Sequence, residues 1–79
     1  MQHATREERW IRCGVRPGMF SNEAVVEVGG HYYFVERDAV RNVVGERGEL
    51  RVTIIHVDGR EWAVLPTNYS DSVPLAATE

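Results

Sequence analysis

The clearest alternation of apolar and polar residues lies between Leu50 and Pro66, and it predicts a β-hairpin. Two runs rich in β-branched and aromatic residues flank the dipeptide Asp58-Gly59. A type I′ turn needs positive φ at both central residues, and Asp followed by Gly adopts this conformation at little steric cost. The two-residue turn also fixes the register of the strands. The expected pairs are Val52 with Leu65, Thr53 with Val64, Ile54 with Ala63, Ile55 with Trp62, His56 with Glu61 and Val57 with Arg60.

This hairpin has two faces of different character. One face is apolar apart from its open end and should pack on the core; it carries Leu50, Val52, Ile54, His56, Glu61, Ala63 and Leu65. The other face is more apolar than the wet side of an antiparallel sheet usually is. We therefore expect an interaction surface there, centred on a tryptophan and formed by Ile55, Val57, Arg60, Trp62 and Val64. The alternative is that this second face forms the core and that another part of the structure covers the first face.

The period-two pattern also predicts a half-buried first strand that starts at Arg9 and ends at Pro17-Gly18. Its inward residues are Ile11, Cys13 and Val15, and its outward residues are Trp10, Arg12, Gly14 and Arg16. The polar segment 1–8 is expected to be flexible, with a short helix capped by Thr5 and Glu8 as the alternative. We expect Met19 and Phe20, which follow the strand, to plug one end of the core.

A second hairpin is predicted for Glu23–Val28 and His31–Glu36, joined by Gly29-Gly30. One face should carry Ala24, Val26, Val28, His31, Tyr33 and Val35, and the other Val25, Glu27, Tyr32 and Phe34. Both faces have bulky side chains, which suits a closed barrel better than a flat sheet. Beyond it, Asp38 resembles a helix N-cap, and valines at helical spacing lead to Gly45. The pattern predicts a helical turn over Asp38–Val44, and a charged loop over Glu46–Glu49.

These elements together predict an all-β fold, a small five-stranded barrel of antiparallel hairpins with one short helical turn. The domain is expected to span residues 9–76, between the flexible segment 1–8 and a C-terminal tail at 77–79. The competing fold is a four- or five-stranded sheet that carries the helix on one face.

A short run near the end of the last hairpin resembles a known family. Ala-Val-Leu-Pro-Thr-Asn-Tyr, at Ala63–Tyr69, is similar to the Gly-x-hydrophobic-Pro-Ser-Asn-Tyr run of Src-homology-3 domains. The resemblance implies a Src-homology-3-like barrel closed by a last strand at 73–76. It also implies a groove for proline-rich peptides, lined by Pro66 and Tyr69 with Asn68 beside them. Ala63 and Ser70 depart from the family's glycine and valine.

Composition narrows the possible functions. The 79 residues suit one domain, 43% are hydrophobic and 27% charged. The net charge of −3 argues against binding nucleic acid by bulk attraction to phosphate, and the absence of lysine excludes Schiff-base chemistry. A single cysteine excludes an intrachain disulfide. No apolar run suits a signal peptide or a membrane span, so we expect a cytoplasmic protein without membrane contact.

No residue pattern predicts catalysis, a cofactor or a metal ion. Cys13 lies on the apolar face of its strand, without a flanking group that would lower its pKa. The candidate metal ligands lack a recognisable spacing; they are His3, Cys13, His31, His56 and Glu61. His56 and Glu61 are more simply a cross-strand charge pair.

We therefore expect a small non-catalytic binding or assembly module that acts by protein–protein interaction, as a homodimer or with another protein. The sequence also indicates a secondary surface, formed by Trp10, Arg12, Arg16, Pro66 and Tyr69. The alternative function is binding of single-stranded nucleic acid by Trp10 and the arginines.

Overall fold

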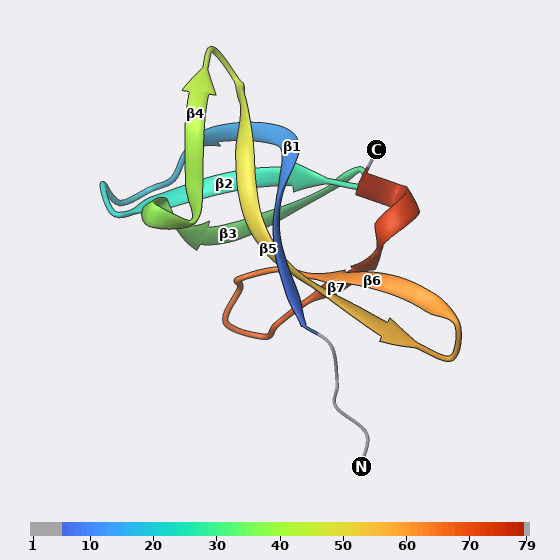
Figure 1. Cartoon of the computed structure of the whole chain (residues 1–79). Helices are drawn as coiled ribbons and strands as arrows, with labels where there is room; N and C mark the ends of the chain where they lie inside the picture. Colours follow the sequence, from blue (N-terminus) through green and yellow to red (C-terminus); the bar gives the residue numbers. More distant parts are fainter. Residues whose placement is uncertain (1–5, 79) are drawn as a thin grey trace.

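Alternating side chains produce strands over most of the chain, and these strands form one curled antiparallel sheet (Figure 1). The computed structural model describes residues 6–78. Its strands are β1 (Glu7–Pro17), β2 (Glu23–Val28), β3 (His31–Glu36), β4 (Val40–Val44), β5 (Arg47–Val57), β6 (Arg60–Val64) and β7 (Ser72–Pro74). Two 3₁₀ turns, η1 (Arg37–Ala39) and η2 (Leu75–Thr78), complete the elements. The all-β class is confirmed, but the described residues form seven strands and not five.

The sheet curls into a half-barrel. Its strand order is β3-β2-β1-β5-β6-β7, and among residues 6–78 the two end strands are not hydrogen-bonded to each other. The long strand β5 is the common partner of three others. It pairs with β1 along one edge, where Ile11 faces Leu50, and with β4 and then β6 along the other.

Both predicted hairpins form in the predicted register. In the β5–β6 hairpin Ile55 pairs with Trp62, and Asp58 and Gly59 have φ values of 52° and 77°. In the β2–β3 hairpin, Gly29-Gly30 form the turn with φ values of 61° and 83°. Positive φ at both central residues is the geometry of a type I′ turn, so the local turn signals were sufficient in both cases.

The ends of the first and last strands differ from expectation. Strand β1 begins at Glu7, two residues before the expected Arg9, because Glu7 and Glu8 pair with Ile54 and Thr53 of β5. The alternative helix cap at Thr5 lies outside the described residues. At the other end, the strand expected at 73–76 stops at Pro74, and η2 follows.

The segment after β3 was predicted incorrectly. Only Arg37–Ala39 forms a 3₁₀ turn, Glu36 and not Asp38 occupies its N-cap position, and the valines that follow belong to β4. The β-branched side chains favour this strand, which gains backbone pairing with β5. A bulge at Asn42, with φ of 53°, interrupts the pairing. The expected loop at Glu46–Glu49 is also wrong, because β5 already begins at Arg47.

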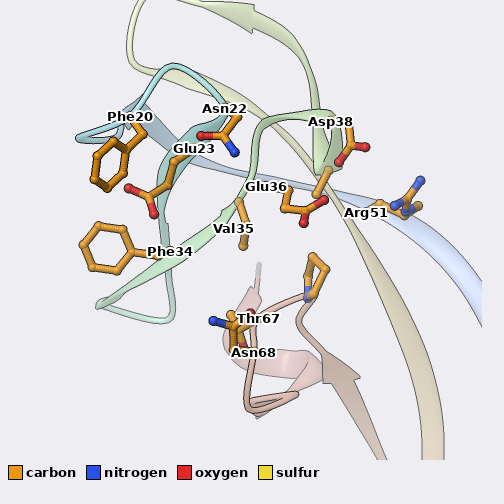
Figure 2. A pocket seen from close by; sticks show the side chains of 12 residues that line it. Phe20, Asn22, Glu23, Phe34, Val35, Glu36, Asp38, Arg51, Thr67 and Asn68 are labelled. Atoms are coloured by element: carbon orange, nitrogen blue, oxygen red, sulfur yellow. The ribbon is translucent and has the colours of Figure 1, made fainter.

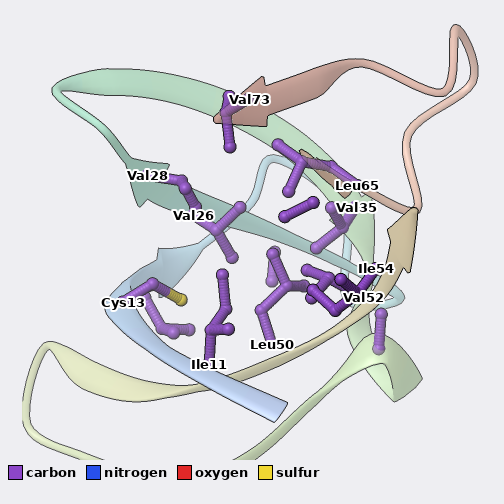
Figure 3. Close-up of a cluster of buried hydrophobic side chains, with 14 residues drawn as sticks. Ile11, Cys13, Val26, Val28, Val35, Leu50, Val52, Ile54, Leu65 and Val73 are labelled. Carbon is purple, nitrogen blue, oxygen red and sulfur yellow. The ribbon is translucent and has the colours of Figure 1, made fainter. Parts of the chain in front are cut away.

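The inward faces of the strands build one apolar core (Figure 3). The predicted core face of the β5–β6 hairpin is buried, so the alternative that assigned the core to the other face is wrong. The buried side chains are Ile11, Cys13, Val15, Ala24, Val26, Val28, Val35, Ala39, Leu50, Val52, Ile54, Ala63, Leu65 and Val73.

Met19 and Phe20 do not plug this core. They are 85% and 64% exposed. The loop that carries them is held against the start of β2, because the backbone N–H of Gly18 donates to the carbonyl of Glu23 and that of Met19 to its carboxylate. The side chains of the loop consequently point away from the sheet interior.

Candidate binding surfaces at the open sheet edge

Strand β3 is an open edge of the sheet. Among the residues that the structure describes, it pairs only with β2. The N–H of Arg37 donates to the carbonyl of Asn22 over 2.9 Å, which places the odd-numbered residues of β3 in hydrogen bonds with β2. The backbone N–H and C=O groups of Tyr32 and Phe34 therefore point away from β2, along the free edge.

A cleft of about 340 Å³ lies beside this edge (Figure 2). One wall is the second half of β3, from Phe34 to Glu36, and the opposite wall is the turn Pro66–Asn68. The cleft lies where the half-barrel is open, between the end strand β3 and the turn before β7. Its floor includes Val35, whose side chain belongs to the core.

The charge of the cleft is negative. Three carboxylates line it, those of Glu23, Glu36 and Asp38, and the single arginine among the lining residues is Arg51. The Glu23 carboxylate already accepts the N–H of Met19 over 3.3 Å. Glu36 and Asp38 are exposed at one end of the cleft, so they present their charge to anything that enters it.

Large apolar side chains gather on the outer side of the same edge. We call Phe20, Tyr32 and Phe34 the aromatic surface. Phe34 is 63% exposed, and Phe20 lies beside it at the mouth of the cleft (Figure 2). Arg16 approaches the ring of Tyr32 to 5.9 Å and pairs with Glu46 over 3.8 Å. The predicted hairpin register already placed Tyr32 and Phe34 together on one face.

The turn opposite β3 is fixed by its own polar groups. The Thr67 hydroxyl donates to the Asp71 carboxylate over 2.7 Å and accepts the N–H of Asp71 over 3.0 Å. Pro66 and Asn68 line the cleft, whereas Tyr69 is 89% exposed and lies outside it. Of the three residues that the Src-homology-3 resemblance assigns to a groove, Pro66 and Asn68 line this cleft and Tyr69 does not.

The predicted interaction surface lies on the outer face of the β5–β6 hairpin, which we call the hairpin face. Ile55, Trp62 and Val64 are half-buried there, and Val57 and Arg60 are exposed at the tip. At the same end, His56 and Glu61 form the expected cross-strand pair, with 3.3 Å between Nε2 and Oε2. The hairpin face is therefore contiguous, but it is less exposed than the aromatic surface.

The other candidate surface is divided by internal contacts. The Arg41 guanidinium lies 3.9 Å from the centre of the Trp10 ring, and Arg41 and Asn42 both donate to Glu49 over 2.9 Å. The hydrogen bond from Arg41, followed by that from Asn42, holds the pKa of Glu49 below its usual value. Arg12 lines a separate pocket with Glu49. Trp10 is thus half-buried and stacked on Arg41, and it lies six positions before Arg16 along β1.

The remaining candidate groups are the Cys13 thiol and the side chains that could bind a metal ion. Burial raises the pKa of the Cys13 thiol to about 11, so it is protonated at neutral pH and a poor nucleophile. Within residues 6–78, which exclude His3, no three metal-ligating side chains of His, Cys, Asp or Glu lie close enough to hold a metal ion. None of the helical segments in that range has the length and apolar character needed to cross a membrane.

Comparison of the chain with protein-family models, curated proteins and solved structures finds no match. The open edge, the cleft and the exposed side chains are therefore the features that indicate a function.

Proposed function

We propose that the protein is a non-catalytic module that binds other polypeptide chains through the aromatic surface. The observation that carries this proposal is the exposure of Phe20 and Phe34 side by side at the mouth of a cleft. Aromatic and methionine side chains are enriched at protein interfaces. Contiguous apolar patches on small proteins mark interaction sites more often than chance.

The position of the aromatic surface also supports this function. It borders the free edge of β3, where backbone groups are available for pairing in addition to apolar contact. A partner could therefore gain both apolar burial and directional hydrogen bonds at one place. The pairing of β3 with β2 positions Tyr32 and Phe34 before a partner arrives.

Site-specific photo-crosslinking in the cells that encode the protein tests this proposal. Benzoylphenylalanine at position 34 should give a discrete protein adduct, which mass spectrometry then identifies. The matched control places the same group at Val44, which is 80% exposed on a different strand. The adduct at position 34 should be lost when Phe20→Ser is introduced. Absence of an adduct, or the same adducts at both positions, would contradict the proposal.

The hairpin face supports a second candidate function, self-association as a homodimer. Ile55 and Trp62 are directly opposed there, and Val57 and Arg60 extend the surface to the hairpin tip. A central tryptophan with an arginine at its rim is a common composition for an interface anchor. The two surfaces lie on different strands, so one protein can use both.

A further inference from the structure

We propose that the partner binds through an extended segment that contains arginine or lysine and that pairs with β3 as an additional strand of the sheet. The segment would occupy the cleft between β3 and Pro66–Asn68. This inference rests on the proposed function, because it assumes a polypeptide partner, and it specifies the chemistry and the mode of binding.

The backbone of β3 is prepared for such pairing. Its odd-numbered residues already form backbone hydrogen bonds with β2. The backbone N–H and C=O groups of Tyr32 and Phe34 therefore face the free edge, without a strand partner among the described residues. A strand placed about 4.8 Å away would bond to both residues. Addition of an extended peptide to an exposed sheet edge is an established mode of recognition.

The other ends of the sheet are less suited to pairing. Strand β7 has only three residues and ends with Pro74, which cannot donate a backbone hydrogen bond. Strand β4 is interrupted by its bulge at Asn42. Short strands, proline and bulges are the devices that protect sheet edges from association. Strand β3 has six residues and contains neither proline nor a bulge.

The negative charge of the cleft determines which class of peptide segment can bind there. Three carboxylates and one arginine line the cleft, which leaves a net negative charge at neutral pH. An acidic segment would be repelled, whereas an arginine or lysine can approach Glu36 and Asp38. The alternation of the added strand then separates two sets of side chains. Outward side chains contact Phe34 and Tyr32, and inward ones contact Val35 and Pro66.

Selection from a displayed library of random linear ten-residue peptides tests the inference. The wild-type protein should enrich peptides with arginine or lysine among β-branched or aromatic residues. These peptides should bind the double variant E36Q/D38N about three- to tenfold more weakly at low salt, because two exposed charges are removed without a change of shape. Phe34→Ser should also weaken them, since it removes apolar contact.

N-methylation of the selected peptide, one residue at a time, tests strand pairing directly. Methylation of alternate residues should weaken binding by more than about tenfold, while methylation of the intervening residues has a smaller effect. Bound peptide should also slow hydrogen exchange at the amides of Tyr32 and Phe34.

Four results would overturn the inference. The first is enrichment of acidic or uncharged peptides, and the second is indifference of binding to the position of N-methylation. The third is slow hydrogen exchange at Phe34 in the free protein that disappears on dilution, which would assign the edge to a second copy of the chain. The fourth is a library that yields no binder, which would exclude a linear segment. In each case photo-crosslinking at position 34 still decides whether a polypeptide binds the aromatic surface.

Discussion

The turn between β5 and β6 depends on two residues whose backbone conformation is unusual for most amino acids. Asp58 and Gly59 both have positive φ. A Cβ atom added at Gly59 would meet no heavy atom within 4 Å. A larger side chain at this position therefore acts through the backbone conformation and not through a clash.

Gly59→Val should lower the free energy of unfolding by about 1–3 kcal/mol, because a β-branched residue is strained at positive φ. Asp58→Asn should leave it almost unchanged, since asparagine tolerates the same conformation. Urea denaturation of the two variants and the wild type measures both effects. Equal stability of Gly59→Val and wild type would contradict the type I′ turn.

The buried thiol of Cys13 predicts a loss of stability at alkaline pH. The pKa of this group rises from 9.0 to about 11 in the folded protein, because burial disfavours the thiolate. Between these pH values the unfolded chain binds fewer protons than the folded protein does. The free energy of unfolding should therefore fall as the pH rises through this range, by about 1–3 kcal/mol.

The matched control for this effect is Cys13→Ala. Other groups also titrate at high pH, but they are common to both proteins. Chemical denaturation at pH 8 and at pH 10.5 should show a smaller loss for the variant than for the wild type. Equal losses would mean that the Cys13 thiol does not contribute.

At the scale of elements, β4 and β5 are held close by a glycine. A Cβ atom at Gly48 would lie 3.0 Å from Cγ2 of Val43 and 3.1 Å from Cγ2 of Val15. Gly48→Ala should lower the free energy of unfolding by about 1–3 kcal/mol, because the surrounding side chains must move. Val43→Ala in the same chain should recover part of this loss. A double-mutant cycle measures the coupling, and a value near zero would contradict the close packing.

Local signals were sufficient for the two hairpins and for the alternation in β1. They were insufficient for β4, because the spacing of its valines fits a helix as well as a strand. The choice is made by pairing with β5, as in the Arg41–Glu49 pair, which no local pattern contains. The same limit applies to Phe20, since the direction of its loop depends on contacts with β2.

The candidate site was predictable only in part. Pro66 and Asn68 were indicated by the resemblance, and the face shared by Tyr32 and Phe34 followed from the hairpin register. The cleft itself was not foreseen, because it joins β3 to a turn about 30 residues later. The cleft also lies where the sheet stays open, whereas the bulky side chains on both faces of the β2–β3 hairpin suggested a closed barrel.

For the whole molecule, the hairpin face predicts a dimer in solution. Light scattering on a sizing column should give about twice the monomer mass for the wild type. Trp62→Arg and Val57→Arg should give folded monomers, because each places a charge in the apolar contact. Phe34→Ser is the control, since it alters the other surface and should leave the dimer intact.

A monomeric wild type would exclude self-association through this face. Unfolding of Trp62→Arg alone would indicate that Trp62 supports the fold, and Val57→Arg would then decide the question because Val57 is exposed at the hairpin tip.

The pairing of β1 with β5 has a consequence for how the chain is made. The second half of β1 pairs with β2, but within residues 6–78 its first half pairs only with β5; Ile11 faces Leu50, a partner about 40 positions later. At translation rates of about 5–20 residues per second, Leu50 follows Ile11 after about 2–8 s. During that time Ile11 has left the ribosome without the strand that pairs with it, whereas Val15 can already pair with Val26 of β2. Synonymous codons that slow translation between β1 and β5 should therefore increase aggregation, because they prolong the time for which Ile11 is exposed.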